Sequence, residues 1–257
     1  MLEKLVGPLR ALAKRWNANG RNVPGSESCA ALLFNEHQDD ETIRFVQPYT
    51  MTSPERVRAL CSAVRYIEEA GIKGAVVECG VWRGGSMMAV ARTLINCGGT
   101  DRDLYLFDTF EGMTEPGPFD ISLKGDSAET LLKQSARTEE DRLWCYAPME
   151  RVVQSLALTK YPESHIHLVP GPVEQTLTVS APEQIALVRL DTDWYASTKH
   201  ELDVLFPKLC PGGVLIIDDY GHWEGARRAV DEYMHQHQIK MQLYEIDYTG
   251  RIGVKTI

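Results

Sequence analysis

Four aspartates stand out in the sequence because they form two close pairs, and each pair ends an apolar, strand-like run. Asp191 and Asp193 follow one run, and Asp218 and Asp219 follow the next. Four carboxylates at neighbouring strand ends would repel one another, and a hard divalent cation that prefers oxygen ligands would remove that repulsion. We therefore predict a Mg²⁺ site formed by Asp191, Asp218 and Asp219. Asp193 leans toward the same side and is predicted to accept a proton from a hydroxyl. The competing interpretation is that Asp218 and Asp219 only cap the following helix.

A second group of residues predicts a cofactor site. An apolar run ends in Glu78-Cys79-Gly80, two more glycines follow, and a helix is expected from Ser86. Glycines let a ligand approach the backbone, and Asp108, at the end of the next run, can accept hydrogen bonds from the hydroxyls of a ribose. Glu78 would repel a pyrophosphate and suits a cationic ligand, so the pattern favours S-adenosylmethionine. The glycine spacing also differs from the GxGxxG of a NAD-type oxidoreductase, which is the rival interpretation.

Short apolar runs that alternate with helical stretches must hold these residues in place. Such runs are typical of a parallel sheet covered by helices on both faces. The last run contains the turn 247–250 and predicts a terminal hairpin, so the sheet should be mixed. The predicted strands are 75–80, 104–108, 165–169, 185–191 and 213–218, with the hairpin in 241–257, and the predicted helices are 8–16, 52–71 and 86–96.

Length and composition predict one soluble enzyme-sized domain. The 257 residues carry a formal net charge of −9, which disfavours nucleic acid as a partner. No apolar run approaches the roughly 20 residues that span a bilayer, and the six scattered cysteines are expected to be reduced thiols of a cytoplasmic protein. We expect a single domain over 1–257, with an N-terminal extension over 1–50. The insertion 111–164, at the carboxyl edge of the sheet, is expected to act as a lid.

Four stretches resemble the macrocin O-methyltransferase family of TylF/NovP type. They are VVECGVWRGGS (76–86), LFDTFEGM (106–113), VRLDTDWYAST (188–198) and GGVLIIDDY (212–220). The resemblance covers about residues 50 to 250. It implies a Rossmann-like class I methyltransferase fold, with a mostly parallel seven-stranded sheet, a C-terminal antiparallel hairpin and N-terminal helices.

The resemblance also implies roles for individual residues. It implies cofactor contacts from Glu78, Gly80, Ser86 and Asp108, a magnesium ion on the three aspartates, and a homodimer. The segment before the first long helix should close over the cofactor, through Thr50 and Met51. This sequence departs from the family pattern just after Met51.

The acceptor follows from the family alone. Its members methylate sugar hydroxyls in antibiotic biosynthesis, so we expect a small-molecule acceptor that contains a sugar: a glycosylated natural product, a nucleotide sugar or a polysaccharide. Chelation of magnesium by a vicinal diol would suit a catechol equally well, and a non-catalytic protein that binds S-adenosylmethionine is a further alternative. His222 and Trp223, just after the last acidic pair, are the candidate acceptor contacts.

Overall fold

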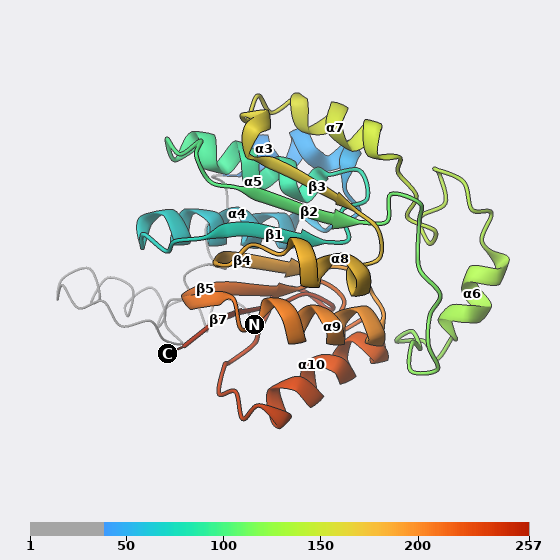
Figure 1. Cartoon of the computed structure of the whole chain (residues 1–257). Coiled ribbons are helices and arrows are strands. Elements are labelled where there is room, and N and C mark those ends of the chain that lie inside the picture. Colours follow the sequence, from blue (N-terminus) through green and yellow to red (C-terminus); the bar gives the residue numbers. More distant parts are fainter. Residues whose placement is uncertain (1–38, 257) are drawn as a thin grey trace, which may run out of the picture.

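A seven-stranded sheet forms the centre of the protein in the computed structural model, which describes residues 39–256 (Figure 1). The predicted helix 8–16 lies outside the described residues. The strand order is β3-β2-β1-β4-β5-β7-β6. The first five strands are parallel, and β7 pairs antiparallel with both β5 and β6. The strands are β1 (Ala75–Cys79), β2 (Leu104–Asp108), β3 (Ile166–Pro170), β4 (Ile185–Leu190), β5 (Leu209–Ile217), β6 (Tyr244–Glu245) and β7 (Arg251–Val254). The predicted mixed, mostly parallel sheet with a terminal hairpin is confirmed.

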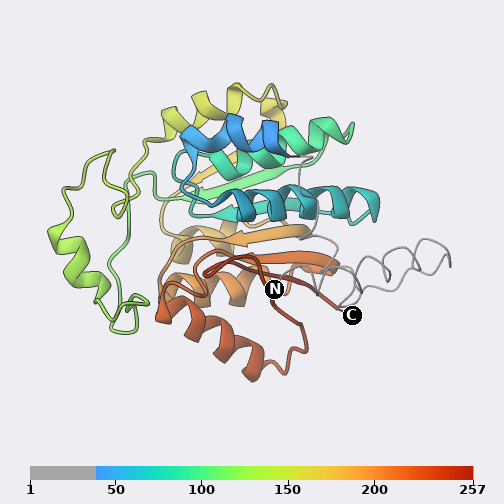
Figure 2. The same ribbon diagram turned by 180° about the vertical axis from the view of Figure 1, so that it is seen from behind.

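Helices cover both faces of the sheet, as Figures 1 and 2 show from opposite sides. On one face lie α3 (Asp40–Val46), α4 (Pro54–Glu69) and α5 (Gly85–Asn96), and on the other lie α8 (Val173–Ser180), α9 (Tyr195–Leu205) and α10 (Glu224–Gln236). Two 3₁₀ turns, η1 (Gln47–Tyr49) and η2 (Glu163–His165), join elements. Within the described residues, no helix has both the length and the apolar character needed to cross a membrane.

The central strands are buried at every position, which explains their continuous apolar sequence. Every residue of β1 and of β4 is buried. The exceptions to apolar character are Glu78 and Arg189, which are only 1% and 3% exposed. A buried charge is costly unless it is paired, so these two residues point to a polar network within the core.

The helix α4 begins as the sequence predicts. Ser53 is its N-cap, and the Ser53 hydroxyl accepts a hydrogen bond from the backbone N–H of Arg56. Pro54 occupies the first helical position, where its missing N–H removes no helical hydrogen bond. This cap fixes the point at which the segment 49–53 passes into the helix, beside the carboxyl ends of the strands.

The insertion 111–164 divides into two parts with different surroundings. Its second part carries α7 (Met149–Ala157), whose Val152 and Leu156 are buried in the main core. Its first part carries α6 (Ala128–Gln134), which lies beyond the strand ends in both views. There Ala128 and Leu132 pack with two tryptophans in a separate small cluster. Only the first part therefore stands over the carboxyl edge of the sheet, while α7 helps to cover the sheet itself.

Candidate functional site

A cavity of about 520 Å³ opens at the carboxyl ends of the parallel strands. This volume lies within the range of small-molecule sites, and the position is the usual ligand site of an open α/β sheet. Eleven of the twelve residues predicted from the sequence line it: Thr50, Met51, Gly80, Ser86, Asp108, Asp191, Asp193, Asp218, Asp219, His222 and Trp223. Glu78, the twelfth, lies behind this lining and contacts it through Arg189.

The turn after β1 can be built only with glycine at position 80. Gly80 has a φ of +81°, and a Cβ atom there would lie 2.0 Å from the backbone oxygen of Asp191. The Asp191 N–H also donates to the Cys79 carbonyl at 2.9 Å. The glycine turn and the first acidic residue are thus in direct backbone contact, which joins the predicted cofactor side of the cavity to its acidic side.

Asp108 organises the same turn from β2. One carboxylate oxygen accepts hydrogen bonds from the N–H groups of Val81 and Trp82, at 2.6 and 3.0 Å, and the other accepts one from Phe110 at 2.8 Å. Burial raises the pKa of Asp108, although these three backbone donors oppose the rise. Trp82 and Phe110 both have positive φ angles, so Asp108 stabilises a backbone conformation that these residues rarely adopt.

Arg189 is a central member of the site that the sequence analysis missed. Its guanidinium donates to Glu78 at 2.5 Å, to Asp191 at 2.6 Å and to Asp218 at 2.6 Å. It also donates to the Thr52 hydroxyl at 2.9 Å. Burial opposes the charge of Arg189, but the carboxylates outweigh it and raise its pKa. The one available signal was a charged residue inside the apolar run Ile185–Leu190.

Asp218 differs from the other acids because both of its oxygens face guanidinium groups. One oxygen pairs with Arg189, and the other pairs with Arg56 from the first turn of α4. Arg56 also pairs with Asp247 of the terminal hairpin turn at 2.9 Å. The sequence argument assumed four acids without a positive partner. The structure differs, because two arginines already neutralise part of that charge.

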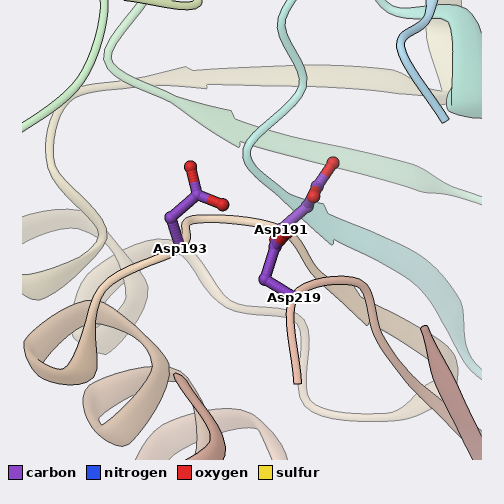
Figure 3. A group of neighbouring side chains, drawn as sticks. All are labelled: Asp191, Asp193 and Asp219. Atoms are coloured by element: carbon purple, nitrogen blue, oxygen red, sulfur yellow. The ribbon is translucent and has the colours of Figure 1, made fainter. Parts of the chain in front are cut away.

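Asp191, Asp193 and Asp219 form the acidic cluster that remains (Figure 3). One oxygen from each lies within 4.8 Å of the others. Asp219 Oδ2 is buried with no hydrogen-bond partner among the described residues. Burial, with repulsion from Asp191 and Asp218, raises the pKa of Asp193 to about 7. Closely spaced carboxylate oxygens, one of them without a partner, suit a hard divalent cation.

The side of the cavity that carries the predicted acceptor contacts is aromatic. Trp223 is 4% exposed and packs edge-to-face on Trp194, with ring centroids 5.0 Å apart. His222 packs edge-to-face on Trp223, also at 5.0 Å, and faces Tyr248, which is 61% exposed. Burial lowers the pKa of His222, and Arg56 adds to this effect. His222 is therefore a neutral ring at the cavity rim, whereas Trp223 is mainly a packing residue.

The first part of the insertion is anchored to this aromatic side. Asp120 is 1% exposed, and its Oδ1 accepts a hydrogen bond from the Tyr195 N–H at 2.7 Å. The Leu123 N–H donates to the His222 carbonyl at 2.8 Å. At the other end of this part, the Met113 N–H donates to the Trp144 carbonyl at 3.1 Å. The first part of the insertion is therefore held at two points: its ends are joined to each other, and the stretch 120–123 is bonded to residues beside the cavity.

Comparisons of sequence and of structure with known proteins point to the same family of O-methyltransferases. The model of the macrocin-O-methyltransferase (TylF) family matches residues 21–252. The 8-demethyl-8-(2,3-dimethoxy-alpha-L-rhamnosyl)-tetracenomycin-C 4'-O-methyltransferase of Streptomyces olivaceus is 34% identical over 79% of this chain and 74% of its own. The mycinamicin III 3''-O-methyltransferase of Micromonospora griseorubida is 31% identical over 89% of this chain and 87% of that relative. The solved structure of the O-methyltransferase NovP is similar with a TM-score of 0.70 and 25% identity, over 90% of this chain and 95% of that chain.

Proposed function

This chain belongs to the macrocin-O-methyltransferase family of S-adenosylmethionine-dependent O-methyltransferases, and from that membership we propose that it methylates a sugar hydroxyl of a small-molecule acceptor with the help of magnesium. The relatives support the acceptor class, because both are named as O-methyltransferases of natural products and one name specifies a rhamnosyl group. The observation that carries the proposal is the single cavity that joins the glycine turn at Gly80 to the acidic cluster.

The residues on the cofactor side fit S-adenosylmethionine. When bound, this cofactor supplies a methyl group on a positively charged sulfur. Glu78 lies just behind the cavity lining, and its Oε2 is buried without a hydrogen-bond partner among the described residues, so its charge would favour a cationic ligand from there. Asp108 would accept from the ribose hydroxyls, and Ser86 at the start of α5 would bind the cofactor's polar end. Thr50 and Met51 would cover the cofactor from the segment before α4.

The residues on the acidic side fit a magnesium ion. Asp191 and Asp219 would hold it, and Asp219 contributes a buried oxygen that has no partner among the described residues. Asp218 would join them by exchanging its contact with Arg56 or Arg189 for the ion. When bound, the ion lowers the pKa of a hydroxyl that contacts it. Arg56 and Arg189 already neutralise Asp218 in part, so they moderate how strongly this side of the cavity attracts a cation.

Asp193 completes the reaction as the proposed general base. Its carboxylate would take the proton of the acceptor hydroxyl, and the hydroxyl oxygen would then receive the methyl group that the cofactor supplies as the bond from methyl carbon to sulfur breaks. A base is most effective when its pKa lies near the working pH, and burial raises the pKa of Asp193 toward that range. His222 at the cavity rim would contact the acceptor, with Trp223 packed behind it.

A methyl-transfer assay tests the proposal. Labelled S-adenosylmethionine would be offered with mycinamicin III, a rhamnosylated tetracenomycin, dTDP-rhamnose and catechol, each with and without EDTA. We expect transfer to one of the three sugar-bearing acceptors and its loss on chelation. Transfer to catechol alone would contradict the sugar acceptor, and activity that survives full chelation would remove magnesium from the proposal.

A pair of variants tests the base. General-base catalysis contributes about 10² to 10⁴-fold, so Asp193→Asn should lower kcat by at least about 100-fold with little change in affinity for S-adenosylhomocysteine. Asp203→Asn, on the exposed side of α9, is the matched control and should retain the wild-type rate. If Asp193→Asn turns over as fast as Asp203→Asn, then Asp193 is not the base.

A further inference from the structure

The turn that carries Asp193 has an unusual backbone. Asp193 has a φ of +70°, and the Trp194 N–H donates to the Thr192 carbonyl at 2.8 Å. A hydrogen bond between residues i and i+2 around a residue of positive φ defines a γ-turn of the rare, strained kind. Such a conformation costs on the order of 1–3 kcal/mol for a residue other than glycine and persists only where its surroundings enforce it.

Glu201 of α9 stabilises this turn through a hydrogen bond from Thr192. Its carboxyl oxygen Oε1 accepts a hydrogen bond from the Thr192 hydroxyl at 2.8 Å. The Thr192 hydroxyl also lies 2.8 Å from the hydroxyl of Ser197. Thr192 immediately precedes Asp193, and its carbonyl accepts the hydrogen bond that closes the turn, so a fixed Thr192 side chain restrains one end of the turn. On the other side of the turn, the indole N–H of Trp194 donates to the Thr114 carbonyl at 3.0 Å.

The burial of Glu201 has no other explanation in the structure. Its side chain is 0% exposed, its Oε2 has no hydrogen-bond partner among the described residues, and the described residues form no ion pair with it. Burial of a carboxyl group is unfavourable when one of its oxygens makes no hydrogen bond. An apolar side chain would fill the same space with a smaller loss of folding free energy. Burial, and next the nearby Glu201 carboxyl, raise the pKa of the Cys79 thiol at the end of β1, so Glu201 lies near the glycine turn as well as the acidic turn.

We propose that Glu201 is a positioning residue for methyl transfer, which acts through Thr192 to keep Asp193 in its γ-turn and its carboxylate in the cavity. The inference rests on the proposed role of Asp193 as the base. Glu201 does not itself line the cavity, so it touches neither the cofactor nor the acceptor.

The ionisation state of Glu201 shapes the choice of variant. Burial raises the pKa of Glu201 to about 8, so the group is protonated and neutral at pH 7. Glutamine has nearly the same shape, is also neutral, and keeps an oxygen that can accept from Thr192. Glu201→Gln is therefore the conservative variant, Glu201→Leu removes the acceptor, and Thr192→Val removes the donor while the shape of the side chain is kept.

Kinetics of the full-length chain form the first test. A displacement of about 1 Å at a reacting group lowers the rate by about 100-fold, so we expect Glu201→Leu and Thr192→Val each to lose about that factor in kcat. The KM for S-adenosylmethionine should change less than about threefold, and Glu201→Gln should stay within about threefold of wild type, since geometry is restored. Should Glu201→Leu fail to fold, Thr192→Val carries the same test.

The second test needs no acceptor. In a crystal structure of Thr192→Val with S-adenosylhomocysteine, Asp193 should leave the positive φ region and its carboxylate should withdraw from the cavity. The proposal is overturned if Asp193 keeps its γ-turn, if Thr192→Val retains the wild-type kcat, or if Glu201→Gln loses as much activity as Glu201→Leu. If the wild-type protein methylates none of the acceptors offered, the proposed function fails, and the φ of Asp193 in the variant still decides whether Glu201 and Thr192 hold the turn.

Discussion

Replacement of Arg189 by methionine would show how strongly the site depends on one buried positive charge. The guanidinium lies within 2.6 Å of oxygens on Glu78, Asp191 and Asp218. Methionine has a similar length and fills the space without a charge. Arg56 would still neutralise Asp218, so the variant leaves two carboxylates, Glu78 and Asp191, without their positive partner.

The size of the effect follows from the fate of those two carboxylates. Removal of one partner from a buried ion pair costs about 3–5 kcal/mol. Glu78 limits the loss, because burial already raises its pKa to about 7 and it can accept a proton. We therefore expect a total loss of about 3–5 kcal/mol rather than that amount for each pair. A loss of this size is a large fraction of the 5–15 kcal/mol that typically stabilises a domain.

The pH dependence of this loss separates charge from packing. Without Arg189, the folded-state pKa values of Glu78 and Asp191 rise further, while their unfolded-state values stay near 4. The folded protein then binds more protons than the unfolded chain, so stability falls as the pH rises from about 5 to 8. The deficit of Arg189→Met should therefore be small at pH 5 and largest at pH 8.

Denaturation with guanidinium chloride at pH 5 and at pH 8 measures both quantities. Arg189→Lys keeps the charge but loses the two-pronged geometry, and it should show a smaller deficit with weaker pH dependence. Arg228→Met removes an exposed charge that pairs with Glu232 on α10, and it should cost less than about 1 kcal/mol. A deficit of Arg189→Met below about 1 kcal/mol at pH 8, or one that is equal at both pH values, would refute the electrostatic explanation.

Three other substitutions have definite expected outcomes. Gly80 and Gly98 share a φ of +81°, but of the two only Gly80 has backbone atoms within 4 Å of an added Cβ atom. Gly98→Ala should therefore lower the free energy of unfolding by only about 1 kcal/mol. Gly80→Ala should abolish the binding of S-adenosylhomocysteine, as measured by calorimetry. Gly225→Ala would place a Cβ 1.9 Å from Asp120 Oδ1 and should release the insertion, which limited proteolysis would detect. Glu201→Gln should weaken the pH dependence of stability. The folded-state pKa of Glu201, about 8, exceeds the ordinary 4.5, so this group lowers wild-type stability by at most about 1.4 kcal/mol per pH unit between these values. Urea denaturation that gives the same change of unfolding free energy with pH for both proteins would contradict this.

The strands and their acidic ends could be predicted because burial on both faces leaves a clear signal. The runs at 185–190 and 213–217 are apolar except for Arg189, and each is followed directly by aspartates. In a parallel sheet, the carboxyl ends of adjacent strands meet at one edge. This rule suffices to bring Asp191 and Asp219 together without any knowledge of their side-chain contacts.

The charges around these acids could not be predicted, because they depend on contacts between distant parts of the chain. Arg56 reaches Asp218 across 162 positions of sequence, and Arg189 reaches Glu78 across 111. The positive φ of Asp193 could not be predicted either, because aspartate adopts positive φ more often than most residues but still only rarely. The division of the insertion 111–164 depends on whether its apolar residues meet the main core, as Val152 does, or the small cluster, as Leu132 does.

The attachment of the insertion makes it an exchangeable module. One attachment point is the contact between Gly112 and Trp144, where a Cβ atom on the glycine would lie 2.5 Å from the indole ring. The other lies at Asp120, beside the first residues of α9 and α10. Between and around these points the chain has its own small core with Trp194, separate from the core beneath the sheet. A transplant of the first part of the insertion from another member of the family should therefore keep the two attachment points and leave the strands, the glycine turn and the aspartates unchanged.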